Sequence, residues 1–170
     1  PDTVKKIEDF AFSNCQKLTM LDLSSFDTSK VQNMQAMFLQ CANLESVDLS
    51  NWNTSNTTAM GAMFGGCTKL KALNLSHFNT KSVTNMSNMF RNTGYKSTIL
   101  EIDVSGFDTS NVTNMSSMFY NTGYNSTVFT LDVNNFDTSK VTNMGSMFEY
   151  TGYSNPNFTL DVSNFNTSNV

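Results

Sequence analysis

The sequence predicts an α/β fold: a leucine-rich-repeat-like, right-handed solenoid of about six coils, with short parallel strands on one face and short helices on the other. Periods of about 20 to 29 residues are typical of leucine-rich repeats, in which each coil buries its apolar side against its neighbours. A Met-x-x-Met-Phe motif recurs here at intervals of 26, 26, 29 and 29 residues, ending at Phe38, Phe64, Phe90, Phe119 and Phe148. An aromatic column keeps the same period, at Phe26, Trp52, Phe78, Phe107, Phe136 and Phe165. A threonine column does so as well, at Thr28, Thr54, Thr80, Thr109, Thr138 and Thr167.

Each repeat contains a segment that predicts a short strand. The pattern Leu-x-x-Leu-x-Leu fits residues 18–23 and recurs with small changes in the next two repeats. Leu21 and Leu23 flank Asp22, and this alternation predicts a strand that points the leucines inward and the aspartate outward. Successive strands are expected to lie side by side in a parallel sheet.

The Met-x-x-Met-Phe motif predicts a short helix in each repeat. In the first repeat Val31, Met34 and Met37 are three residues apart, which places them on one helical face. The Asp-Thr-Ser group at 27–29 offers side-chain oxygens that can cap the free amides at the start of this helix. Ten of the eleven methionines lie in the two motif columns, and we expect them to be core residues rather than a metal or partner site.

The repeats form one predicted domain over residues 1–170, with 26-residue coils over 1–90 and 29-residue coils over 91–170. Three inserted residues before the strand account for the longer coils. The chain starts and stops within the repeat pattern, whereas solenoids normally end in capping repeats with a polar outer face. We therefore expect the chain to be a fragment of a longer array.

Composition and motifs argue against several classes of function. The net charge is −4 and the Lys and Arg residues do not cluster, which argues against nucleic-acid binding. No run approaches about 18 consecutive apolar residues, so we expect no membrane insertion by this segment. His77 is the only histidine and has no partner Ser or Cys in a defined turn, and no phosphate-binding glycine loop is present. We expect no catalytic residue, no cofactor and no enzyme activity.

Cysteines occur once in each of the first three repeats. Cys15, Cys41 and Cys67 are 26 residues apart, whereas metal sites usually pair ligands about two to four residues apart. A disulfide between neighbours would leave one cysteine over. The spacing favours three free, mostly buried thiols.

The repeat motif resembles that of a known family. Residues 131–148 read Leu-Asp-Val-Asn-Asn-Phe-Asp-Thr-Ser-Lys-Val-Thr-Asn-Met-Gly-Ser-Met-Phe. They resemble the tandem "LDLSNFDTSNVTNMSxMF" repeats of bacterial surface proteins, and residues 4–15 resemble the related BspA-like leucine-rich repeat. The resemblance covers essentially the whole chain. It implies an extracellular or cell-surface protein of bacteria with an adhesive or host-interaction role, whose signal and anchor lie outside this segment, and it supplies no catalytic residue.

A row of acidic residues is one candidate interaction surface. Six of them are expected to face outward from the strands: Asp22, Asp48, Glu101, Asp103, Asp132 and Asp161. The row either binds divalent cations weakly or a basic patch on a partner, or it is a solvated polar face with some raised aspartate pKa values. A single row lacks the converging oxygens of a calcium cage, which favours the solvated face.

A second candidate surface consists of Tyr95, Tyr124 and Tyr153, one in each three-residue insertion. The spacing aligns them along one edge of the last coils. There they either stack on sugars or anchor a protein partner, or they pack over the loop and shield the core.

These observations favour a non-catalytic recognition or adhesion module that binds a protein or glycan of a host or neighbouring cell. The alternative is a rigid structural spacer or fibre segment that presents another domain. An enzyme would need titratable groups that converge in a pocket, and the sequence shows rows instead.

Overall fold

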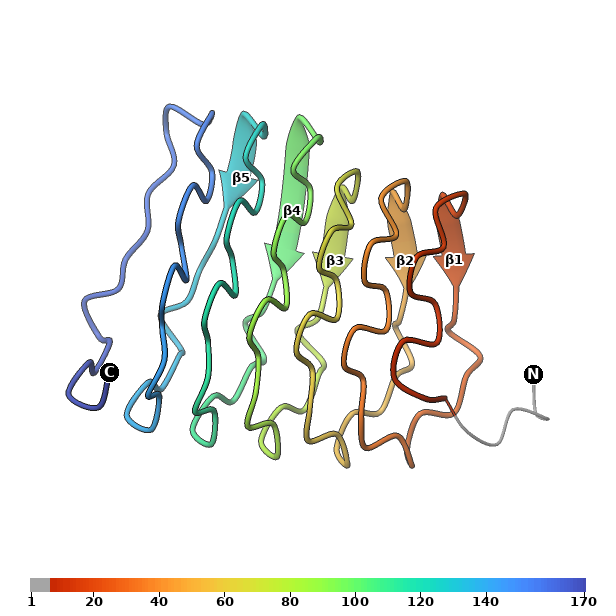
Figure 1. Ribbon diagram of the computed structural model, residues 1–170, viewed down its shortest axis with the longest axis horizontal. Coiled ribbons are helices and arrows are strands. Elements are labelled where there is room, and N and C mark those ends of the chain that lie inside the picture. Colours follow the sequence, from red (N-terminus) through yellow and green to blue (C-terminus); the bar gives the residue numbers. More distant parts are fainter. Residues whose placement is uncertain (1–6) are drawn as a thin grey trace.

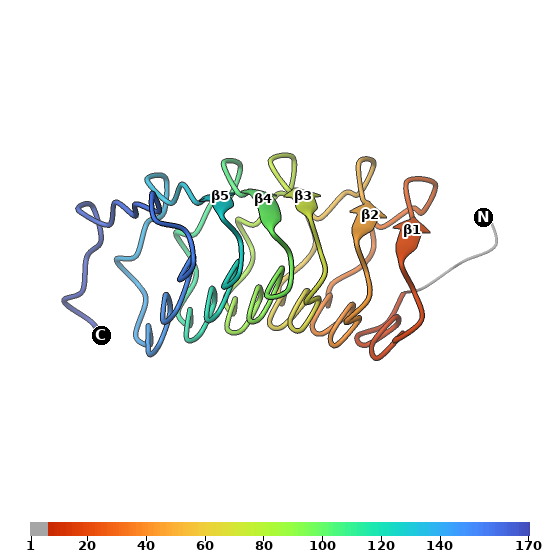
Figure 2. The same cartoon turned by 90° about the horizontal axis from the view of Figure 1, so that it is seen from above.

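The computed structural model describes residues 7–170, so residues 4–6 of the opening motif lie outside it. Its five strands are β1 (Met20–Asp22), β2 (Ser46–Asp48), β3 (Ala72–Asn74), β4 (Ile99–Asp103) and β5 (Val128–Thr130). They form two small parallel sheets, β1–β2 and β3–β4–β5. The repeats follow one another along the long axis of the molecule (Figure 1). Viewed from above, the five strands lie along the same side (Figure 2).

The predicted short strands and their parallel pairing are confirmed. Leu21 lies opposite Val47, and Asp22 lies opposite Asp48. Leu23 is buried, while Asp22 is exposed, as the alternation predicts. The single continuous sheet that we expected is divided between β2 and β3, which are linked by a hydrogen bond from the Lys71 N–H to the Glu45 carbonyl oxygen.

The predicted α/β class, with its face of short helices, is wrong. Residues 7–170 contain no helix, and hence none that is long and apolar enough to cross a membrane. The Met-x-x-Met-Phe segments are consecutive turns whose amides alternate between two partners. The Met37 N–H donates to the Met34 carbonyl oxygen at 3.4 Å, and the next amide, of Phe38, donates to Met63 in the following repeat at 2.9 Å. Half of the amides in these segments therefore join neighbouring repeats.

Left-handed backbone conformations explain why no helix forms. Ala36 has φ 54° and Gln40 has φ 60°. A residue with positive φ at the third position of a turn is typical of type II turns, and it interrupts a right-handed helix because that helix requires negative φ throughout. The same conformation recurs in every later motif, at Ala62, Gly66, Asn88, Asn92, Ser117, Asn121, Ser146 and Tyr150.

The residues predicted to cap helices have a related role in turns. The Asp27 side chain accepts a hydrogen bond from the Ser29 N–H at 2.9 Å, and Asn33 accepts one from the Gln35 N–H at 2.8 Å. Such Asx turns offer the backbone an alternative to helical bonding. Asn33 also begins a row of isolated parallel bridges that continues through Ala59.

The core contains the residue columns that the sequence predicts. The motif phenylalanines form a continuous stack with Phe12, with adjacent ring centroids 5.2 to 6.0 Å apart and interplanar angles of 2 to 13°. Nine of the motif methionines are buried and Met144 is partly buried, whereas Met20 is 71% exposed. The methionine columns are thus core residues, as expected.

A buried threonine column fastens each repeat to the next. The Thr80 hydroxyl donates to the Asp108 carbonyl oxygen at 2.9 Å and accepts from the Asp108 N–H at 2.8 Å. Thr28 makes the same two bonds with Asn53, and Thr138 makes them with Asn166. Because these threonines are at most 1% exposed, no water replaces the bonds if they are lost.

Replacing Thr80 by Val is therefore expected to destabilise the protein. Val has nearly the same shape but leaves the Asp108 amide and carbonyl without a partner, which costs about 1–3 kcal/mol. Equilibrium urea unfolding measures the change. The exposed Thr130 of β5 provides the matched control, and Thr130→Val should stay within about 0.5 kcal/mol of the parent. Equal effects at both positions would contradict a role for the buried bonds.

Candidate interaction surface

The acidic row faces solvent, but its aspartates are engaged with their own backbone. The Asp22 Oδ1 accepts hydrogen bonds from the Ser24 N–H at 2.9 Å and from the Ser24 hydroxyl at 2.7 Å. Asp48, Asp103, Asp132 and Asp161 accept the equivalent amide bond at 2.9 Å. Each of these aspartates therefore closes an Asx turn with the residue two positions later in the chain.

Several aspartates of the acidic row have lowered pKa values, whereas the sequence analysis expected raised ones. Hydrogen bonds from the following serine lower the pKa of Asp22 and Asp103, and they do the same at Asp161. The expectation of raised aspartate pKa values is wrong at these positions, because hydrogen bonds to the charged form outweigh desolvation by burial, which alone acts to raise the pKa. Residues 7–170 contain no group of three or more His, Cys, Asp or Glu side chains that can hold a metal ion.

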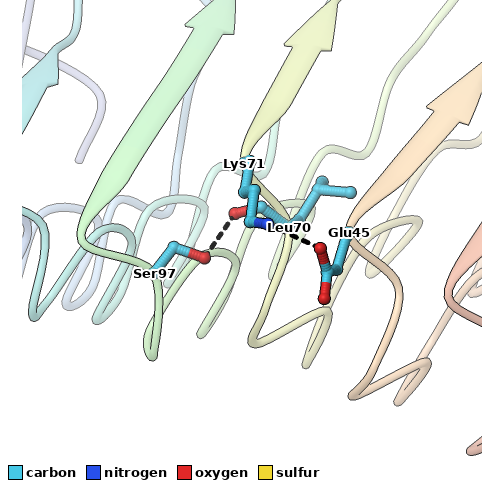
Figure 3. A network of polar contacts seen from close by, with 4 residues as sticks. All are labelled: Glu45, Leu70, Lys71 and Ser97. Atoms are coloured by element: carbon cyan, nitrogen blue, oxygen red, sulfur yellow. Dashed lines mark hydrogen bonds and ion pairs between the residues drawn. The ribbon is translucent and has the colours of Figure 1, made fainter.

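Polar contacts just before the strands connect neighbouring repeats. Figure 3 shows the ion pair of Lys71 with Glu45 and the Ser97 hydroxyl that donates to the Leu70 carbonyl oxygen at 2.9 Å. Lys71 lowers the pKa of Glu45 through its hydrogen bond and charge. The ion pair is exposed, so it contributes little stability. Glu101 makes no ion pair within the described residues, and its charge is left on the open face of the sheet.

A shallow groove of about 340 Å³ crosses this face, lined by Ala72, Leu73, Asn74, Glu101, Ile102, Asp103 and Thr130. Ile99 and Val128, which pair across β4 and β5, are 50% and 57% exposed. The sheet face thus combines carboxylates, an apolar pair and a shallow depression.

The three predicted tyrosines lie together at the surface. Tyr124 stacks between Tyr95 and Tyr153, with both centroid distances 4.9 Å and interplanar angles of 25° and 13°. Tyr150 meets Tyr124 and Tyr153 edge-on at 6.2 and 5.9 Å, and Tyr120 at 6.3 Å. All five tyrosines of the chain form this cluster, which we call the tyrosine ridge: Tyr95, Tyr120, Tyr124, Tyr150 and Tyr153.

The three-residue insertion produces the ridge. In the second long repeat Gly123 has φ 59°, and a Cβ atom there would lie 2.8 Å from the Phe129 ring. Glycine therefore lets the chain turn tightly over Phe129. The turn places Tyr124 at the surface, and the side chain of Asn125 then donates to the Tyr95 carbonyl oxygen at 2.9 Å. Neighbouring insertions are thereby held in the register that stacks the rings.

Tyr150 lowers the local stability in two ways. Its φ of 56° is unfavourable for a large side chain, whereas the equivalent residues Asn92 and Asn121 tolerate such values. Asn121 donates its side-chain amide to the Asn92 Oδ1 at 3.0 Å. The Oδ1 of Asn121 is buried without a hydrogen-bond partner, because Tyr150 stands where a third asparagine would donate to it. Backbone conformation and hydrogen bonding both favour Asn over Tyr at this position.

Sequence reasoning missed Tyr120, Tyr150 and Arg91. The Arg91 guanidinium lies over the Tyr120 ring, 4.8 Å from its centroid. Both missed tyrosines lie in columns that hold other residue types in other repeats, since Tyr120 follows Arg91 at the period and Tyr150 follows Asn121. The break in the asparagine column was the available signal.

The cysteines belong to the scaffold. All three are free thiols, with Cys41 and Cys67 buried, as predicted. The Cys67 thiol donates to the Phe38 carbonyl oxygen at 3.2 Å, and the equivalent Thr93 hydroxyl donates to that of Phe64 at 2.9 Å. Burial raises the pKa of the Cys67 thiol far above its ordinary value, so it stays protonated.

Family comparison matches the chain to "Mycoplasma protein of unknown function, DUF285", over residues 7–123 and 94–170. The chain belongs to this family. The two matches to the DUF285 family overlap within the longer repeats, which confirms the expected membership of a repeat family, while the finer BspA-like assignment stays a prediction. No curated protein and no solved structure matched the chain.

The aspartate turns of this DUF285 chain predict a loss of stability in acid. The pKa is lowered in the folded state at Asp22, Asp27, Asp103, Asp108, Asp137 and Asp161. Their contribution is complete above the ordinary pKa of 3.8 and is lost as the pH falls through the lower folded values. Melting temperatures from pH 6 to pH 2 should therefore decrease mainly below about pH 4. Asn at all six positions keeps the turns and should flatten this decrease; an unchanged profile would contradict the assignment.

Tyr150→Asn is expected to stabilise the protein by about 1–2 kcal/mol, because it relieves the left-handed strain and supplies a donor to Asn121. Chemical denaturation measures the gain. Tyr153→Asn removes a neighbouring exposed ring without either benefit, so it should not stabilise. A lower stability of Tyr150→Asn than of the parent would show that ring contacts outweigh the strain.

Proposed function

We propose that this chain is a non-catalytic recognition or adhesion module of a bacterial surface protein, outside the cell, which binds a protein or glycan of a host or neighbouring cell through the tyrosine ridge. The ridge carries the proposal. All five tyrosines of the chain meet at one surface, and Tyr150 and Tyr153 are 49% and 64% exposed. Amphipathic aromatic rings of this kind are enriched at binding interfaces.

The position of Tyr150 supports a binding role. A residue that lowers local stability without serving the core is typical of functional sites, where strain is retained for interaction. Tyr150 combines positive φ, an unpartnered neighbour and a half-exposed ring. The core itself is complete without it, because the phenylalanine stack and the methionine columns lie elsewhere.

The family resemblance supports a location at the cell surface. The motif resembles BspA-like leucine-rich-type repeats of bacterial surface proteins, and membership of a Mycoplasma repeat family is consistent with a bacterial source. The abundance of Asn, Ser and Thr with only 14% charged residues is also typical of extracellular repeat proteins.

A rigid spacer or fibre segment is the second candidate. The observation that favours it is the unbroken phenylalanine stack from Phe12 to Phe148, which joins successive repeats through one column of rings. Such a column stiffens the array but offers no site of its own. The two functions differ in whether the free chain binds anything.

Screening the folded chain against glycan, mucin and matrix-protein panels, with and without calcium, separates them. We expect a hit that is lost in the Tyr95/Tyr124/Tyr153→Ser variant, with the melting temperature lowered only slightly, because these rings lie outside the core. Calcium-dependent binding that survives the substitution would instead place the site at the acidic row, with weak divalent cation binding. The absence of any hit from a folded chain would favour the spacer.

A further inference from the structure

The centre of the ridge is poorly suited to stacking on sugars. Both faces of Tyr124 are covered, by Tyr95 on one side and Tyr153 on the other. The neighbouring amide groups are also engaged, since Asn125 donates to the Tyr95 carbonyl oxygen and Asn121 donates to Asn92. A sugar needs an open ring face with free polar groups beside it. The accessible part of the ridge is instead its end at Tyr150 and Tyr153, which are the exposed rings.

The ridge already binds one guanidinium group. Arg91 lies over Tyr120 with its central carbon 4.8 Å from the ring centroid, within the range of a cation–π interaction. Arg91 belongs to the repeat before Tyr120, so this cation reaches the ring from the neighbouring repeat. The exposed rings in the following repeat have no such cation among residues 7–170.

An exposed acidic residue lies next to Tyr150 in the chain. Glu149 precedes Tyr150 and occupies the column of Arg91 and Tyr120, and its carbonyl oxygen accepts the Asn121 N–H at 2.9 Å. The Glu149 residue is exposed and forms no ion pair in the described part of the chain. Exposed aromatic rings and an unpaired carboxylate on neighbouring residues complement a guanidinium, which stacks on rings and binds carboxylates in a planar fork.

We propose that the end of the ridge formed by Glu149, Tyr150 and Tyr153 binds an arginine side chain from a cationic segment of a partner protein. This proposal rests on the recognition function above and names its partner chemistry. The net charge of −4 attracts such a segment over a distance set by the ionic strength. Arg91 and Lys96 belong to the repeat that carries Tyr95, two repeats before Glu149, and Arg91 is already placed over Tyr120.

Short dye-labelled peptides test this chemistry on the full chain by fluorescence anisotropy. One peptide alternates glycine with arginine, a second has lysine in place of arginine, and a third has citrulline, the neutral isostere of arginine. We expect the arginine peptide to bind more tightly than the lysine peptide, and the citrulline peptide to bind weakest. Added salt should weaken the arginine complex.

Two pairs of variants locate the site. Glu149→Gln removes a charge from the ridge, and Glu101→Gln removes the same charge from the sheet face. Tyr153→Leu keeps an apolar side chain but removes the ring at the exposed end of the ridge, and Phe10→Leu removes a 48% exposed ring outside the ridge. We expect about a fivefold or greater loss of affinity for Glu149→Gln and Tyr153→Leu. Their two partners should retain most of the affinity.

Three outcomes would overturn the proposal. These are equal binding of the citrulline peptide, a loss of affinity at Glu101 but not at Glu149, or no binding of any peptide by the folded chain. In each case the screen against glycan, mucin and matrix-protein panels still tests the proposed recognition function independently. A glycan hit that depends on the tyrosines would preserve the recognition module and exclude the arginine site, whereas the lack of both kinds of binding would remove both proposals.

Discussion

Sharing of backbone amides between neighbouring repeats is the constraint on which this structure depends. Within each motif one amide closes a turn in its own repeat and the next donates to the following repeat, as Met37 and Phe38 show. This alternation requires left-handed residues at fixed positions, and it is incompatible with a helix. It also brings equivalent side chains into register. The phenylalanine stack, the threonine bonds and the tyrosine ridge are all consequences of that register.

The core columns and the short parallel strands could be predicted because equivalent residues recur in the sequence at a fixed period. Columns such as Phe38 and Phe64 must meet once successive repeats align, and the alternation around Asp22 defines a strand. The helix was wrongly predicted because apolar residues three apart, such as Met34 and Met37, suit consecutive turns as well as a helix. The informative residues were those at the left-handed positions. Gly66, Asn92 and Asn121 point to positive φ, but Ala62 and Ser117 at related positions obscured the pattern.

The candidate surfaces were predicted to different extents for local reasons. The spacing of Tyr95, Tyr124 and Tyr153 sufficed to align them, whereas the sequence marks Tyr150 only as a break in the column of Asn92 and Asn121, and its effect on the Asn121 hydrogen bond needs the structure. The outward direction of the aspartates was predictable from strand alternation. Their engagement in turns was also encoded, because Asp22 and Ser24 form an Asp-x-Ser pattern that supplies both the acceptor and its donors.

The hydrogen bonds between repeats also determine how the chain responds to force. Figure 1 shows the repeats arranged in single file, so tension between its two ends acts along the direction in which one repeat bonds to the next. Each repeat is held mainly by its two neighbours, and a terminal repeat by one. Tension would therefore peel repeats away one after another, each releasing about 100 Å of extended chain. An array of this kind yields in steps and absorbs work while its remaining repeats keep their structure.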